Sequence, residues 1–318
     1  MAVRPVALYA VANERHFLGL VALLNSLRLQ RHDEPLLVSD CGLADWQRDL
    51  LAPHVEVVTV ARELPPHLLK PVLPRERSAK TMVLLDADLI VLRPLGELLG
   101  GAAAVVAFTD PVAHRFHPQW SSLLGLPPLR PGPYLNSGLL VLSGTRARAI
   151  LELVAEKQEL VDVAGTRDRG GRPESPFYYA DQDVWNAVLA SSLEPSELAL
   201  LPADLAPHPP FRGLHPAAGG DLRFAYADGR EPFVLHHVDR KPWLAATRMN
   251  AYSRLLPRLL LGEDVALRLE PAQVPARFRP GARAALARAG VEAGALAYRM
   301  RGRVGLRRRL AERRRARS

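Results

Sequence analysis

Short apolar runs alternate with segments of helical periodicity through the first half of the chain. Between residues 17 and 29, leucines recur three and four positions apart, which predicts the buried face of a helix. A second helix is expected over 43–51. The apolar runs predict strands at 6–11, 36–38, 55–60, 82–87 and 103–108. Strands that alternate with helices are typical of an α/β fold, in which helices cover both faces of a largely parallel sheet.

The second half has a less regular pattern. It predicts a strand at 139–142 and helices at 146–160, at 183–190 and near 252–260. Segments rich in proline, glycine and polar residues are expected to form loops at 127–133, 166–176 and 202–220. The sequence contains neither GxGxxG nor GxxxxGK[ST]. This argues against an ordinary dinucleotide-binding protein or an ATP-driven motor.

The run from Leu84 to Leu92 is apolar except for two carboxylates, Asp86 and Asp88. Burying an unpaired carboxylate is costly, so a strand that served only as core would not carry two of them. Side chains alternate along a strand, and the two should therefore point the same way. Converging carboxylates at a strand's end suit a hard divalent cation. The motif indicates a metal-dependent enzyme that handles a nucleotide diphosphate; the alternative is a solvated turn.

Two amide-containing clusters follow. Asn136 precedes a predicted strand, where its amide would hold the hydroxyls of a sugar or simply form a turn. Asp181 and Gln182 precede a predicted helix. There the aspartate would accept hydrogen bonds from sugar hydroxyls, and the glutamine would present an amide at the reacting carbon. The structural alternative is an acidic helix start, which the helix dipole favours.

The last cluster contains His236, His237 and Lys241, followed by Pro242 and Trp243. A histidine near a carboxylate pair can complete a metal site. A lysine can neutralise a phosphate as a point charge. The alternative is a surface loop held by a packed tryptophan.

Together these clusters resemble glycosyltransferase family 8, which includes glycogenin-like and bacterial lipopolysaccharide galactosyl- and glucosyltransferases. The motifs of this family occur here in the family's order between Val6 and Trp243. They are an N-terminal strand with a following Asn, then DxD, N-[AS]-G, D-Q, and His before Lys-Pro-Trp. The resemblance implies the GT-A nucleotide-diphospho-sugar transferase fold, with a mostly parallel central sheet flanked by helices. We expect this domain at 1–262. An Ala/Arg-rich helical or disordered extension is expected at 263–318, ending in a basic tail at 299–318.

The resemblance also implies roles for individual residues. Asp86 and Asp88 would bind the metal with His236 or His237 as third ligand. His236 is favoured, although it lies five positions before Lys241 where the family usually has six. Oxygen ligands plus one imidazole suit Mn²⁺ somewhat better than Mg²⁺, which is the alternative. Gln182 and Asp181 would be the catalytic residues, and the donor would contact Asn13, Lys70, Asp86, Asp110, Asn136 and Lys241.

The implied reaction moves a hexose, glucose or galactose, from a UDP-sugar to an acceptor hydroxyl with retention of anomeric configuration. The acceptor would be a glycan, lipid-linked or protein molecule in cell-surface glycan or glycolipid synthesis. One alternative is a catalytically silent module that binds nucleotide sugars or glycans. Another is a sugar-1-phosphate nucleotidyltransferase, which normally has a glycine-rich loop after the first strand. Ala10–Arg15 has no glycine there, which argues against it.

Composition narrows the cellular setting. Cys41 is the single cysteine, so no internal disulfide can form, which fits a reducing cytoplasm. No apolar stretch reaches the length of a membrane span. The segment from Arg299 to Ser318 contains ten arginines and one acid and thus carries the whole net charge of +9. The rest of the chain, residues 1–298, has no net charge, which argues against nucleic-acid binding. We expect a cytoplasmic enzyme whose basic tail is either simply solvated or attached to the anionic inner face of a membrane.

Overall fold

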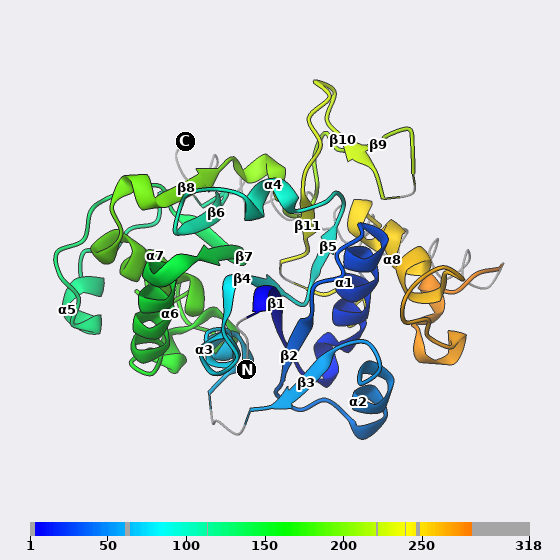
Figure 1. Cartoon of the computed structure of the whole chain (residues 1–318), viewed down its shortest axis with the longest axis horizontal. Helices are drawn as coiled ribbons and strands as arrows, with labels where there is room; N and C mark the ends of the chain where they lie inside the picture. Colours follow the sequence, from blue (N-terminus) through cyan, green and yellow to red (C-terminus); the bar gives the residue numbers. More distant parts are fainter. Residues whose placement is uncertain are drawn as a thin grey trace, which may run out of the picture.

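The computed structural model describes residues 4–60, 64–112, 114–220, 222–238, 240–245 and 249–281. Its centre is a seven-stranded sheet in the order β3-β2-β1-β4-β7-β6-β8 (Figure 1). These strands are β1 (Arg4–Ala12), β2 (Leu36–Asp40), β3 (Glu56–Thr59), β4 (Ala79–Asp86), β6 (Val105–Thr109), β7 (Leu135–Ser143) and β8 (Leu198–Leu201). The helices are α1 (Phe17–Leu29), α2 (Asp45–Leu51), α3 (Val72–Glu76), α4 (Gly96–Leu99), α5 (Trp120–Leu124), α6 (Gly144–Gln158), α7 (Asp181–Ser192) and α8 (Ala251–Leu261). The expected mixed α/β architecture is confirmed.

Strand β7 is the exception to the parallel arrangement, because it runs antiparallel to both β4 and β6. All the other neighbours in the sheet are parallel. The beginning of β7 consequently lies at the same edge of the sheet as the ends of β4 and β6. Asp86, Asp110 and Asn136 reach this edge from three different strands.

Both faces of the sheet are buried. On β1, Leu8 and Ala10 pack into one apolar cluster, whereas Ala7 and Tyr9 pack into another on the opposite face. The first cluster includes α1 and α8, and the second includes α6 and α7, which lie on opposite sides of the sheet in Figure 1. Because both faces of the sheet are buried, the sequences of these strands are continuous apolar runs.

A short pairing outside the main sheet brings a distant segment to its edge. Strand β5 (Leu89–Val91) pairs antiparallel with β11 (Val234–His236), and His236 is the partner of Leu89 in the register. His236 is therefore placed beside Asp88 by backbone pairing. The strands β9 (His215–Pro216) and β10 (Phe224–Ala225) form a hairpin that extends from the body in Figure 1.

The segment after α8 packs on the same core as the main domain. Four of its side chains are buried in the cluster around α1, namely Leu267, Leu269, Val274 and Phe278. Asn25 on α1 fastens it, because its side chain donates to the carbonyls of Leu259 and Leu267 and accepts from the Leu267 amide. Residues 263–281 thus share the core. The basic tail at 299–318 lies outside the described residues.

Local pattern predicted most elements closely. The helix expected at 17–29 coincides with α1, whereas the strand expected at 139–142 begins four residues earlier, at Leu135. The sequence pattern did not predict the first residues of this strand, because Asn136 and Ser137 are polar. Leu135 and Asn136 belong to the strand because they pair with β6. Strand β4 ends at Asp86, so a turn rather than strand alternation positions Asp88. Among the described residues, no helix is both long and apolar enough to cross a membrane.

Candidate active site

Two carboxylates and one imidazole converge at the carboxyl end of β4. His236 Nε2 lies 3.4 Å from Asp86 Oδ2 and 3.3 Å from Asp88 Oδ1, and one ligand atom from each residue falls within 4.8 Å of the others. Asp88 and His236 are buried, and Asp86 is partly exposed. Lys241 forms an ion pair with Asp88 through its Nζ.

Asn136 sets the orientation of the imidazole. Its Nδ2 donates to Asp110 and Gln182, so its Oδ1 is the acceptor for His236 Nδ1, 3.1 Å away. The Nε2 atom of His236 therefore faces the carboxylates. Gly138 makes room for the ring, because a Cβ at this position would lie 2.2 Å from His236 Cε1.

The electrostatics of the cluster favour the charged forms. Burial opposes ionisation of Asp86 and Asp88, yet Lys70 lowers the pKa of Asp86, and Lys241 and His236 hold the pKa of Asp88 well below its usual range. Burial also opposes a charged His236, but Asp88 and then Asp86 outweigh it and raise its pKa to about 9. The His236 imidazolium, Lys70 and Lys241 together compensate the two carboxylates.

The His237 side chain contacts residues outside this cluster. Its Nε2 lies 3.2 Å from Asn250 Nδ2, and its ring packs edge-on against Tyr252 with 5.0 Å between centroids. Burial lowers the pKa of His237 to about 4. Of the two histidines that the sequence left as alternatives, His236 is the one directed at Asp86 and Asp88.

Lys70 connects Asp86 with Asp181. Its Nζ lies 2.7 Å from Asp86 Oδ1 and 3.0 Å from Asp181 Oδ2, and it donates to the Ser137 carbonyl. Burial opposes its charge, but Asp181 and Asp86 outweigh this and raise the pKa of Lys70. The Ser137 hydroxyl also donates to Asp181 Oδ2 at 3.0 Å.

The Gln182 amide is held by a network of hydrogen bonds. Its Oε1 accepts from Asn136 Nδ2 at 3.0 Å and from the Ser137 amide at 3.2 Å, while its Nε2 donates to Asp110 Oδ2 at 3.2 Å. These residues come from the end of β6, the start of β7 and the start of α7. Ala180, which precedes α7, has φ of 48°, an uncommon conformation for a residue with a side chain.

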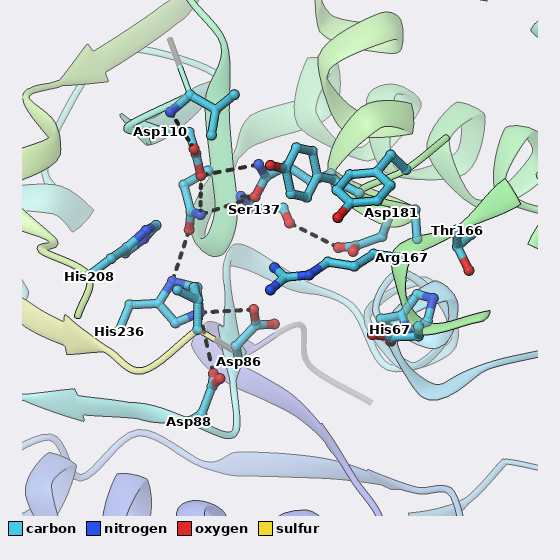
Figure 2. A pocket seen from close by; sticks show the side chains of 18 of the residues that line it. His67, Asp86, Asp88, Asp110, Ser137, Thr166, Arg167, Asp181, His208 and His236 are labelled. Carbon is cyan, nitrogen blue, oxygen red and sulfur yellow. Dashed lines mark hydrogen bonds and ion pairs between the residues drawn. The ribbon is translucent and has the colours of Figure 1, made fainter. Parts of the chain in front are cut away.

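Most of the expected residues line one cavity of about 360 Å³ (Figure 2). Asn13 is not among its lining residues. It follows β1, two positions beyond the register partner of Asp86, and its Oδ1 lies 2.8 Å from His16 Nδ1. Lys70 is buried behind the wall through its contacts with Asp86 and Asp181.

Several lining residues were not anticipated. All of them lie in connections between the main helices and strands, in loops or short 3-10 turns without a distinctive motif, and they are His67, Arg167, Asp168, Tyr178, Tyr179 and His208. His208 stacks edge-on against the His236 ring, with 4.9 Å between centroids. The loop at 166–176 was recognised as polar, but sequence held no signal for which of its side chains face the cavity.

The chain is similar in structure to solved glycosyltransferases. An active-site glutamine-to-glutamate mutant of LgtC matches with a TM-score of 0.56 and 15% identity, over 84% of this chain and 99% of LgtC. Galactosyltransferase LgtC in complex with donor and acceptor sugar analogues matches with a TM-score of 0.54 and 16% identity over the same shares. No protein-family model and no curated protein sequence matches the chain. The expected GT-A fold, implied by the resemblance to glycosyltransferase family 8, is confirmed.

The cluster has the chemistry of a divalent-cation site. It offers hard carboxylate oxygens and one oriented imidazole nitrogen. Within the described part of the chain, Asp88 Oδ1 is buried and accepts no hydrogen bond of regular geometry, although His236 Nε2 lies 3.3 Å away. A buried carboxylate oxygen usually has a well-formed partner, and a cation between the two side chains would be one. The residues present therefore fit a metal ion.

Proposed function

We propose that the protein is a metal-dependent glycosyltransferase that moves a hexose, glucose or galactose, from a UDP-sugar to an acceptor hydroxyl. The observation that carries the proposal is the convergence of Asp86, Asp88 and His236 beside the Asp110, Asn136 and Gln182 network in one cavity of a GT-A fold. One half offers ligands for a cation, and the other offers amides and carboxylates for sugar hydroxyls.

Asp86, Asp88 and His236 would hold the cation, with Mn²⁺ preferred and Mg²⁺ as the alternative. When bound, such an ion supplies positive charge where the diphosphate leaves. Lys241 would then be released from Asp88 and become available to the diphosphate. On the nucleoside side, Asn13 extends from the end of β1 at the same edge of the sheet.

On the sugar side, Asp110, Asn136 and Asp181 would position hydroxyl groups. Lys70 orients Asp181 and also contacts Asp86, so it couples the two halves of the site. Gln182 would present its amide oxygen to the anomeric carbon as a weak stabiliser, because this oxygen already accepts two hydrogen bonds. LgtC, which shares the fold, has a glutamine in its active site.

The reaction that follows from this arrangement breaks the bond between the anomeric carbon and the phosphate oxygen, and the electron pair goes to the diphosphate. The acceptor oxygen bonds to the same carbon, and its proton passes to the departing phosphate. No strong carboxylate base beside the acceptor is then required, which is consistent with retention of configuration. A glycan acceptor is supported by LgtC, which binds an acceptor sugar analogue.

We further propose that residues 1–262 contain the catalytic residues, with 263–281 completing the same core, and that the basic tail at 299–318 attaches a cytoplasmic enzyme to the anionic inner face of a membrane. Each arginine near such a surface would contribute about 1 kcal/mol. A lipid-linked acceptor would benefit from this attachment. Binding to vesicles with and without anionic lipid, before and after removal of the tail, tests it. Equal binding to both vesicle types would contradict it.

The central test measures nucleoside diphosphate release from UDP-, GDP- and ADP-sugars with Mn²⁺ and with chelator. The control is the double substitution Asp86→Ala and Asp88→Ala, and His237→Gln serves as a matched variant of a histidine outside the cluster. Metal-dependent turnover of one UDP-sugar that the double variant abolishes supports the proposal. Metal-dependent nucleotide binding without turnover would favour a silent binding module instead.

A further inference from the structure

The connection between α6 and α7 forms one wall of the cavity, and its conformation is built from specific contacts. Thr166 is only 1% exposed, and its carbonyl accepts from the Gly171 amide at 2.8 Å. The Arg167 amide donates to the Tyr178 carbonyl at 2.9 Å. A Cβ on Gly171 would lie 2.0 Å from the Gly165 carbonyl oxygen. The backbone around Arg167 is therefore closely packed against itself.

A buried ion pair anchors the same connection to α7. Arg115 Nε lies 2.6 Å from Asp183 Oδ1, and its other nitrogens donate to the carbonyls of Pro173 and Ser175. The side chains of Arg115 and Asp183 are 7% and 0% exposed. A buried ion pair rarely makes a protein more stable than apolar side chains of similar volume would. We therefore explain the pair between Arg115 and Asp183 by its effect on structure, because it holds the connection in one conformation.

Arg167 extends from this anchored connection into the cavity. Figure 2 shows its side chain reaching past Asp181 toward Asp86. It is close enough to influence Tyr179, whose pKa is raised by burial and by Asp110 and is partly lowered again by Arg167 and Arg115. In this view its guanidinium is drawn between Asp86 and Asp181, which line the same cavity.

This position corresponds to the bond that breaks in the proposed reaction. A donor that spans the cavity would place its diphosphate near Asp86 and its sugar near Asp181. The group between them is the phosphate that carries the sugar. A guanidinium offers phosphate oxygens two parallel hydrogen bonds, which a lysine cannot.

We propose that Arg167 binds the β-phosphate of the donor and stabilises the charge that this phosphate gains as the sugar leaves. The inference rests on the proposed function and adds a residue that none of the sequence motifs contains. The electron pair of the bond between the anomeric carbon and oxygen goes to this phosphate, which also receives the acceptor's proton. Arg167 remains protonated throughout.

The test compares UDP with UMP, which lacks the β-phosphate. Calorimetry measures the affinity of each nucleotide, with Mn²⁺ present, for the wild type, Arg167→Gln and Arg167→Lys. The matched control is Arg169→Gln, which removes a charge from the same short helical turn at an exposed residue that does not line the cavity. Turnover of the active UDP-sugar is measured in parallel.

Arg167→Gln is expected to weaken UDP binding about 10- to 100-fold, the usual effect of losing hydrogen bonds to a charged group, and to leave UMP binding nearly unchanged. Arg167→Lys should recover part of the loss, and Arg169→Gln should match the wild type. Equal losses for UDP and UMP, no loss for either, or a change confined to the acceptor KM would each overturn the assignment. Failure of the wild type to bind UDP would instead overturn the proposed function, and this inference with it.

Discussion

Metal binding should strengthen as the pH rises, because a cation must displace the proton from His236. The pKa of this imidazole is raised to about 9 in the metal-free protein, mainly by Asp88 against the opposing effect of burial. The pKa values of Asp86 and Asp88 are lowered, so both carboxylates stay ionised near neutrality. His236 is then the ligand whose protonation changes.

The size of the effect follows from the distance between the working pH and this pKa. Below about pH 9, each unit of pH changes the fraction of unprotonated imidazole about tenfold. Between about pH 6 and about pH 8, the apparent metal affinity should therefore rise about 100-fold, or ~2.7 kcal/mol. Close to one proton should be released for each ion bound.

The stability of the metal-free protein should show the opposite trend. His236 has a folded-state pKa above its unfolded value, so its contribution to stability is complete below the unfolded pKa of 6.5 and is lost as the pH rises through about 9. Removal of the metal should accordingly destabilise the protein more at the alkaline end of this window than at the acidic end.

Titration calorimetry with Mn²⁺ at several pH values, in buffers of different ionisation enthalpy, measures both affinity and proton release. His237→Gln should keep the full dependence, because its ring contacts Asn250 and Tyr252 rather than the carboxylates. His236→Gln should bind weakly and lose the dependence. A pH-independent affinity in the wild type, with no proton released, would refute the reasoning.

Three further predictions concern the support of the site. Gly138→Ala should abolish metal-dependent thermal stabilisation, because the new methyl would lie 2.2 Å from the His236 ring. Arg115→Met should lower the free energy of unfolding in urea by about 3–5 kcal/mol, because Asp183 would remain buried without its cation. The stability of residues 263–281 is tested with two truncated chains, one that ends at residue 281 and one that ends at residue 262. The chain that ends at residue 262 should have a much lower melting temperature than the chain that ends at residue 281, since four buried side chains, each contributing about 1.5–3 kcal/mol, would be lost.

Each of these has its own check. Gly132→Ala adds a methyl where no atom lies within 4 Å, and it should leave metal binding intact. If it weakens metal binding as much as Gly138→Ala does, the steric explanation is wrong. Adding Asp183→Asn to Arg115→Met should restore part of the lost stability, and no recovery would argue against an uncompensated charge. Equal melting temperatures for the two truncations would show that residues 263–281 are not part of the core.

The alternation of apolar runs and helical periodicity determined the fold class, because these signals depend on neighbours along the chain. Helix α1 was predicted to the residue for this reason. Asp86 was also visible, because a carboxylate within an apolar run needs a reason to be there. The roles expected of Asp181 and Gln182 were implied by the resemblance to glycosyltransferase family 8. Spacing alone left His236 and His237 as alternatives.

Only the tertiary structure decided between the histidines. Pairing of β5 with β11 sets His236 beside Asp88, and Asn136, a hundred positions away in the chain, turns its ring toward the carboxylates. Similarly, the antiparallel course of β7 brings the start of one strand to the ends of two others. Arg167 could not have been found from its local sequence, because the ion pair that anchors its connection joins residues 68 positions apart. Such contacts depend on which distant segments of the chain meet in the fold, and a local sequence pattern contains no information about this.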